Sequence, residues 1–89
     1  MRFEWDRRKA QLNLRKHRVG FDEAATVFYD PLSVTFDDPD HSLDEERLIT
    51  VGFSLHKRLL VISHVERGSV IRIISARTAT ARERRKHEE

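Results

Sequence analysis

The sequence predicts an α+β domain: one antiparallel β-sheet, two N-terminal helices packed on one of its faces, and a C-terminal helix. The first observation is a hairpin pattern, in which apolar β-branched runs at residues 59–65 and 70–74 flank a turn containing Gly68. The second is the order of candidate elements, which runs strand, helix, helix, four strands and helix. With 89 residues, we expect one domain that spans residues 1–89.

Basic side chains interrupt the predicted hairpin. Arg72 lies inside its second strand, Arg77 follows that strand, and His64 lies late in the first. A charge within a strand is costly unless it faces water or a partner, so we expect one open, cationic face. A two-residue turn at residues 67–68 puts His64 and Arg72 on opposite faces, and a one-residue slip reverses this. The sequence leaves both registers open.

The N-terminal segment predicts a short strand and a helix. Residues 3–5 alternate as a strand, and Asp6 is a good N-cap for a helix over residues 7–17. We expect this helix to lie across the sheet and to end at Gly20. Its predicted inward stripe consists of Ala10, Leu14 and His17.

Further elements follow from caps and alternation. Asp22 can cap a helix over residues 23–29, and Pro31 follows its end. A strand over residues 33–36 is expected to point Val34 and Phe36 inward, and residues 47–54 form another strand candidate.

Two polar segments complete the elements. Residues 37–46 have the composition of a loop, and although several are possible metal ligands, their spacing matches no calcium loop and offers a single histidine. We therefore predict no metal site and no cofactor. Thr80 and Glu83 have the spacing of a capping box for a helix that begins near Ala81. That helix is almost entirely polar, so a frayed basic tail is the alternative.

Charge is segregated along the chain although the net charge is only +2. Residues 1–18 contain seven Lys and Arg against two acids, and residues 67–89 contain seven against three. Residues 19–46 contain nine acids and no Lys or Arg. Two basic ends that meet in the fold would form a surface that attracts polyanions, and nucleic acid is the obvious candidate.

The basic residues include the groups needed to cleave RNA without a metal. That reaction needs a proton acceptor, a proton donor and cations that stabilise a pentavalent phosphorane. The candidate catalytic residues are Lys16, His17, His64, Arg72, Arg77 and Glu83. The candidate RNA-binding residues are Arg82, Arg84, Arg85 and Lys86.

Other classes of function lack their sequence signals. The chain has no cysteine, no nucleophile elbow, no P-loop and no dinucleotide fingerprint. It also has no signal peptide and no apolar run long enough for a membrane span, so we expect a cytoplasmic protein without membrane contact.

An ordered set of short motifs resembles the BrnT family across nearly the whole chain. The matching segments are residues 3–6, 13–17, 21–24, 30–31, 40–42, 45–47, 72–77 and 83–84. Two positions depart from the family pattern. Arg18 stands where the family commonly has Gly, and His87 stands near a common Tyr. An imidazole ring can stack on a base as a tyrosine ring does.

This resemblance implies a type II toxin with a RelE-like fold, a ribonuclease that arrests translation. It also implies neutralisation by a BrnA-like antitoxin, with which the toxin can form a heterotetramer, and binding of operator DNA only through that complex. Lys16, His17, Arg72, Ser75, Arg77, Glu83 and Arg84 fall on motif positions.

In the resulting hypothesis Arg72 and Arg77 hold the scissile phosphate, and His17 or His64 transfers protons. Glu83 is a possible base, although its capping role is favoured. Two alternatives remain from the sequence: a nucleic-acid-binding module without catalysis, and a protein-interaction domain whose basic C-terminal helix docks on an acidic partner.

Overall fold

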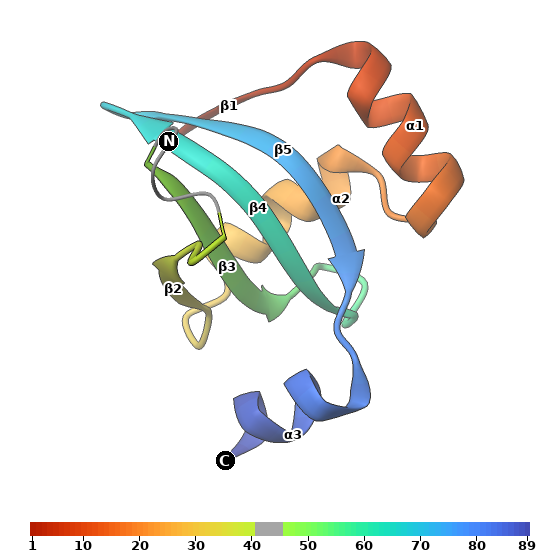
Figure 1. The fold of residues 1–89 in the computed structure, drawn as a ribbon, viewed down its shortest axis with the longest axis vertical. Coiled ribbons are helices and arrows are strands. Elements are labelled where there is room, and N and C mark those ends of the chain that lie inside the picture. The colour runs from red at the N-terminus through yellow and green to blue at the C-terminus, as the bar shows by residue number, and fades with distance from the viewer. Residues whose placement is uncertain (41–45) are drawn as a thin grey trace.

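The computed structural model describes residues 1–40 and 46–89 (Figure 1). The elements in chain order are β1 (Arg2–Glu4), α1 (Arg7–His17), α2 (Phe21–Thr26), the 3-10 turn η1 (Val27–Tyr29), β2 (Val34–Asp37), β3 (Arg47–Phe53), β4 (Leu59–Arg67), β5 (Val70–Thr78) and α3 (Ala81–Glu88). The predicted α+β class is confirmed.

The five strands form one sheet in the order β1-β5-β4-β3-β2. Four of them are antiparallel as predicted, but β1 pairs in parallel with β5, so the sheet is mixed. The reason is topological. In the chain, β1 is followed by α1 and α2 before the other strands begin, and a long connection of this kind allows β1 to pair in parallel. No local turn signal specifies a pairing between the first and the last strand.

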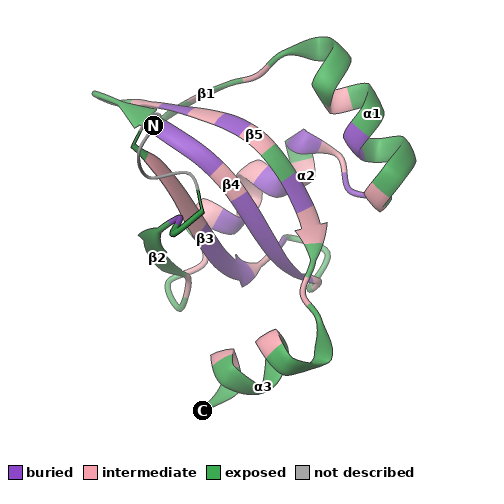
Figure 2. Cartoon of the chain, in the orientation of Figure 1, coloured by how far each residue is buried: buried purple, intermediate pink, exposed green. Residues whose placement is uncertain are grey.

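One face of the sheet is covered by α2 and η1, which lie behind β4 in Figure 1. Phe21, Ala24 and Val27 from this helical segment form a single core with apolar residues of β4 and β5. The strand residues that point into this core are Leu60, Ile62, Ile71, Ile73 and Ala76. Burial is concentrated on this side and along β4, whereas β2 and α3 are exposed (Figure 2).

Gly52 allows the segment after η1 to approach β3 closely. A Cβ at this position would lie 2.7 Å from Ser33 Cβ and 3.1 Å from Asp30 Oδ2. That close approach lets Asp30 Oδ2 accept the Phe53 N–H at 2.8 Å, which fixes the start of the turn toward β4.

The helix α1 contacts the sheet through Asn13 and not through Leu14 as predicted. Leu14 is 53% exposed, whereas Asn13 is buried. Its Nδ2 donates to Ala76 O at 2.7 Å and Val19 O at 3.0 Å, and its Oδ1 accepts the Ala76 N–H at 3.1 Å. The amide thus replaces a neighbouring strand beyond the end of β1, and α1 lies along the β5 edge and does not cross the sheet.

Two helix ends differ from the prediction. The helix α1 begins at the predicted cap, because Asp6 accepts from two backbone N–H groups, but it ends at Arg18 in the left-handed conformation with φ 60°. Gly20 is instead the N-cap of α2, with an ordinary φ of −82°, so Asp22 lies inside that helix. Left-handed geometry favours glycine, the residue common in the BrnT family at the position of Arg18.

The strand β2 does not point its apolar residues inward. Val34 is 52% exposed and Phe36 46% exposed. They lie at the sheet edge, on the face opposite α2, where a second and smaller core cluster of Val51, Leu59 and Val61 is centred on β3 and β4. The sequence pattern gave the alternation correctly but could not show which face is covered. Of the predicted loop over residues 37–46, residues 41–45 lie outside the described part of the chain.

His64 lies inside the core and forms part of a buried polar chain. It is 1% exposed, its Nε2 lies 2.7 Å from Thr50 Oγ1, and Thr50 Oγ1 lies 2.7 Å from Thr35 Oγ1. The Phe28 ring packs edge-on against the imidazole with centroids 4.8 Å apart. Burial lowers the pKa of His64 from 6.5 to about 4, so the ring is neutral at pH 7.

We predict that His64 makes the fold sensitive to acid. Since its pKa is lower in the folded state, the unfolded chain binds the proton more readily between pH 6.5 and 4, and stability should fall by about 3 kcal/mol over that interval. Urea denaturation at several pH values measures this. Between pH 6.5 and 5, where the carboxylates contribute little, the slope should largely disappear in His64→Gln and remain in His56→Gln, a change at an exposed turn residue. An unchanged slope in His64→Gln contradicts the assignment.

Candidate functional site

A β-bulge in the β4–β5 hairpin decides which basic side chains share a face. The turn residues are Gly68 and Ser69, with φ 61° at Gly68 as predicted, and Arg67 pairs with Val70. Ser63 opposes Ser75 but His64 opposes Ile73, so Ile74 is an extra residue in β5.

The bulge changes the alternation of β5. Arg72 and Arg77 are an odd number of residues apart and would point to opposite faces in a regular strand. Because Ile74 is inserted between them, Arg72 opposes Val65 and Arg77 opposes Val61, which are four residues apart on β4. Both arginines therefore belong to the face opposite the helices, and His64 belongs to the helical face.

This open face consists of cross-strand rows of side chains. One row contains Arg72, Val65 and Arg47; the next contains Ser75, Ser63, Ile49 and Phe36; the third contains Arg77, Val61, Val51 and Val34. Arginines thus stand at the β5 end of the two outer rows, with a pair of serines between them. Apolar side chains occupy the β2 end.

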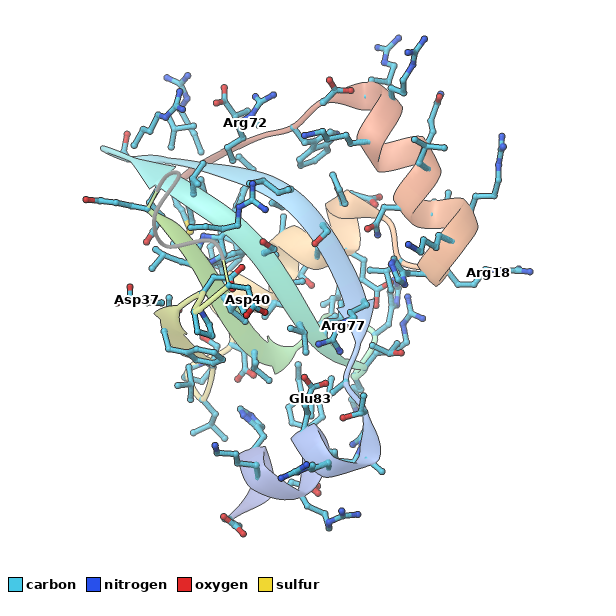
Figure 3. All side chains as sticks on the ribbon, in the orientation of Figure 1. Arg18, Asp37, Asp40, Arg72, Arg77 and Glu83 are labelled. Carbon is cyan, nitrogen blue, oxygen red and sulfur yellow. The ribbon has the colours of Figure 1, made fainter. Side chains whose placement is uncertain are left out.

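Arg72 and Arg77 share a face but do not converge on one point (Figure 3). At about 3.3 Å per residue they are roughly 15 Å apart along β5. This spacing favours contacts with different phosphates, and the expectation that both bind the scissile phosphate stays a prediction. Arg72 also lies 3.5 Å from Glu4 Oε1 in an exposed ion pair, which leaves the guanidinium accessible.

Arg77 is held by Glu83 of α3 in a two-pronged ion pair. Arg77 Nη1 donates to Oε1 at 2.8 Å and Nη2 donates to Oε2 at 2.9 Å. The same carboxylate accepts the Thr80 N–H at 2.9 Å and completes the predicted capping box. Hydrogen bonds from Arg77, and then from Thr80, lower the pKa of Glu83 from 4.5 to about 2. Such a weakly basic carboxylate is poorly suited to accept a proton, which favours the capping role.

The helix α3 brings a row of basic side chains to the end of the open face. Glu83 and His87, four residues apart, are half-buried and face the sheet, and the His87 ring lies 5.9 Å from the Phe53 ring. The residues on the other sides are exposed, and they include all four predicted RNA-binding residues, Arg82, Arg84, Arg85 and Lys86. His87 thus contributes a ring contact between α3 and β3.

Lys16 and His17 come from a different element, the end of α1. Lys16 is exposed, and His17 is half-buried one turn beyond Asn13, on the side of the helix that faces β5. The next residue, Arg18, accepts a hydrogen bond from Arg58 Nη2 through its carbonyl at 3.0 Å. The structure thus brings Glu83 and α3 to Arg77 and places His64 on the opposite face of the sheet.

Three residues of this site were absent from the predicted set. Arg47 shares a row with Arg72, Ser63 opposes Ser75, and His87 faces the sheet beside Glu83. Alternation within residues 47–54 and i, i+4 spacing within the last helix are signals that could have found Arg47 and His87. The pairing of Ser63 with Ser75 depends on the bulge, which nothing in the sequence marked.

Within residues 1–40 and 46–89, no group of three or more histidine, aspartate or glutamate side chains could hold a metal ion. Among those same residues, no helix has the length and apolar character that crossing a membrane requires.

Comparison with known protein families identifies the chain. The model of a family described as "Ribonuclease toxin, BrnT, of type II toxin-antitoxin system" matches residues 5–83. The chain belongs to the BrnT family. It is therefore a ribonuclease toxin of a type II toxin-antitoxin system, with an antitoxin as its partner, and the family resemblance predicted from its motifs is confirmed. Membership favours the enzyme over both alternatives left open by the sequence.

The fold agrees with this assignment. The structure is similar to a crystal structure of the Brucella abortus ribonuclease toxin BrnT, with a TM-score of 0.71 and 23% sequence identity. The alignment covers 90% of this chain and 97% of the Brucella chain. A search among curated proteins finds no match.

We predict that Glu83 docks α3 on the open face by two separable interactions. Glu83→Ala removes the capping box and the Arg77 ion pair, so amide hydrogen exchange in residues 81–88 should accelerate about fivefold, as expected for the loss of a helix cap. Glu83→Gln keeps a capping side chain and should show a smaller increase. Glu88→Gln, on the same helix, is the control. Equal exchange in Glu83→Ala and the native chain contradicts the docking role.

Proposed function

We propose that this BrnT toxin is a metal-independent endoribonuclease that binds RNA on the β5 side of the open face. Its cleavage of RNA arrests translation in the cytoplasm, and a BrnA-like antitoxin neutralises it. The toxin and antitoxin form a heterotetramer, and only this complex binds operator DNA. The observation that supports RNA binding at this face is the shared orientation of Arg72 and Arg77 across the bulge.

The spacing of the arginines suits successive phosphates of one RNA strand. Arg72 and Arg77 are roughly 15 Å apart along β5, with Ser63 and Ser75 between them, so each arginine contacts a different phosphate. The basic side chains of α3 then continue the same cationic surface beyond Arg77. RNA would therefore lie along β5 and continue onto α3.

Arg77 is the residue best placed to stabilise charge at the reacting phosphate. Two of its five N–H donors are directed at Glu83 and a third at Thr78 O at 3.3 Å, which leaves two for a phosphate oxygen. The ion pair raises the pKa of Arg77 and fixes its guanidinium, so the donors are already oriented before RNA binds. Glu83 is accordingly a positioning residue in this proposal.

His87 replaces His64 in the proposed proton transfer. His64 is buried on the opposite face, whereas His87 borders the open face next to Glu83. His87 contacts Phe53 on β3, two strands from β5, which places it about 10 Å from the strand of Arg77. An RNA phosphate bound by Arg77 can thus lie between the guanidinium and the imidazole.

The cleavage assay for this proposal uses purified toxin, a single-stranded RNA and EDTA. Arg77→Ala should reduce the rate about 100-fold, because it removes pre-oriented donors at the developing negative charge. EDTA should leave the native rate unchanged. Arg8→Ala, which removes an exposed arginine in the first turn of α1, is the control and should be fully active. Full activity in Arg77→Ala, or loss of native activity in EDTA, contradicts the proposal.

We predict that His87 transfers a proton and does not only pack. His87→Phe keeps an aromatic ring against Phe53 but should lower the cleavage rate about 100-fold, because phenyl cannot donate or accept a proton. His17→Phe, at the end of α1, should retain the native rate. A fully active His87→Phe, or a rate loss found only in His17→Phe, contradicts proton transfer by His87.

A further inference from the structure

The two edges of the sheet differ in how far their backbone groups are paired. On the β5 side, β1 pairs with residues 70–72 and the Asn13 side chain bonds to both backbone groups of Ala76. On the opposite side, β2 pairs only with β3, and no described segment pairs with its outer edge. An open strand edge is a template for a further strand.

The backbone groups that face outward from β2 follow from its register. The Asp38 N–H donates to Arg47 O at 3.0 Å, and the register that pairs Asp37 with Leu48 puts Asp38 opposite Arg47. Inward and outward groups alternate along an antiparallel strand, so Val34 and Phe36 also bond toward β3. Thr35 and Asp37 therefore point their N–H and C=O groups outward, which provides two donors and two acceptors for another chain.

Exposed apolar side chains accompany this edge. Val34 and Phe36 alternate along β2 on the open face, and both are about half exposed. Leu32, 72% exposed, precedes them. Nearby is a groove of ≈ 470 Å³ whose lining includes Tyr29, Phe53 and Leu55. Single exposed apolar residues are ordinary, but a row of them beside an open strand edge is typical of a protein-binding surface.

The charge around β2 argues against RNA as the occupant. Residues 30–40, which include β2, contain four aspartates and no Lys or Arg. Exposed Asp37 and Asp40 lie at the end of β2 in Figure 3. Phosphates are repelled here and attracted to the β5 side, so the two sides of the sheet suit different partners. A protein segment with apolar side chains and flanking Lys or Arg is complementary to the β2 side.

We propose that an extended segment of the antitoxin adds to the outer edge of β2 as a sixth strand. Its backbone pairs with Thr35 and Asp37, and its apolar side chains contact Val34 and Phe36. The inference rests on the antitoxin partner that BrnT membership supplies, and it is independent of the RNA contacts proposed above. It separates the surface that recruits the antitoxin from the surface that binds RNA.

A proline at position 35 tests the strand pairing directly. Thr35→Pro removes an N–H that points outward and leaves the backbone hydrogen bonds to β3 intact. Edge strands tolerate proline at such outward-facing positions. The affinity for the purified cognate antitoxin, measured by isothermal titration calorimetry, should fall at least 100-fold. The control is Thr35→Val, which loses the same hydroxyl but keeps the N–H, and it should bind normally. Both variants should keep native ribonuclease activity, which also shows that they are folded.

A second pair of variants tests the apolar contact without altering the backbone. Phe36→Lys should weaken antitoxin binding at least 30-fold, whereas Leu12→Lys, at an exposed apolar residue of α1, should not. Unchanged affinity in active Thr35→Pro and Phe36→Lys overturns the proposal. A second outcome also overturns it: the native toxin is a dimer, and Thr35→Pro dissociates the dimer but leaves antitoxin affinity unchanged. In that case the edge of β2 pairs with a second copy of the toxin. Loss of ribonuclease activity in the Arg77 and His87 tests has no bearing on this binding result.

Discussion

The β-bulge at Ile74 is the constraint on which the functional surface depends. A regular strand would direct Arg72 and Arg77 to opposite faces, and one of them would then enter the apolar core. Burying an unpaired guanidinium costs several kcal/mol, so the regular register is excluded by the same core that α2 builds. The inserted residue resolves this conflict, because Ile73 and Ala76 both face the core while Arg72 and Arg77 both face solvent.

Closure of the β5 edge depends on a single side chain. Beyond residue 72 the strand has no neighbouring strand on its outer side, and the Ala76 backbone would be buried without partners. Asn13 supplies both a donor and an acceptor in the geometry of a peptide group. Because the same Nδ2 also binds Val19 O, it fixes α1 and the entry to α2 relative to β5. One amide therefore orients two helices and one sheet edge.

Local signals in the sequence predicted most of the elements but not their long-range arrangement. Asp6, Gly68 and the Thr80–Glu83 box specify helix starts and a turn within four residues, and all three act as predicted. The orientation of Val34 and Phe36 was wrong, because alternation reveals that two faces exist but not which of them a helix covers. Helical position alone did not decide between Leu14 and Asn13, since Asn13 is buried only through its distant partner Ala76.

The candidate site shows the same division between local and distant information. The open, cationic face was predicted from Arg72 and Arg77 in the hairpin, and both lie on the face opposite α2. The meeting of the two basic ends, predicted from the charge segregation, stays a prediction. His64 was included because it belongs to the same hairpin, yet pairing with Thr50 and contact with Phe28, both distant, turn it into a neutral core residue. The buried Thr35–Thr50–His64 chain gives His64 Nε2 a hydrogen-bond partner that the apolar pattern of β4 did not reveal, while Nδ1 is buried without one among the described residues.

Arg77 connects the stability of α3 with the chemistry of the open face. The helix is polar on nearly every side and has no buried residue, so few contacts besides the Glu83 ion pair and the Phe53–His87 contact hold it. An exposed ion pair alone is worth little, but here the carboxylate is also part of the helix cap, and the two interactions support one another. The helix therefore adopts its position only when the bulge directs Arg77 outward. The orientation of the basic side chains on α3 thus depends on one extra residue in β5, about ten positions earlier in the chain.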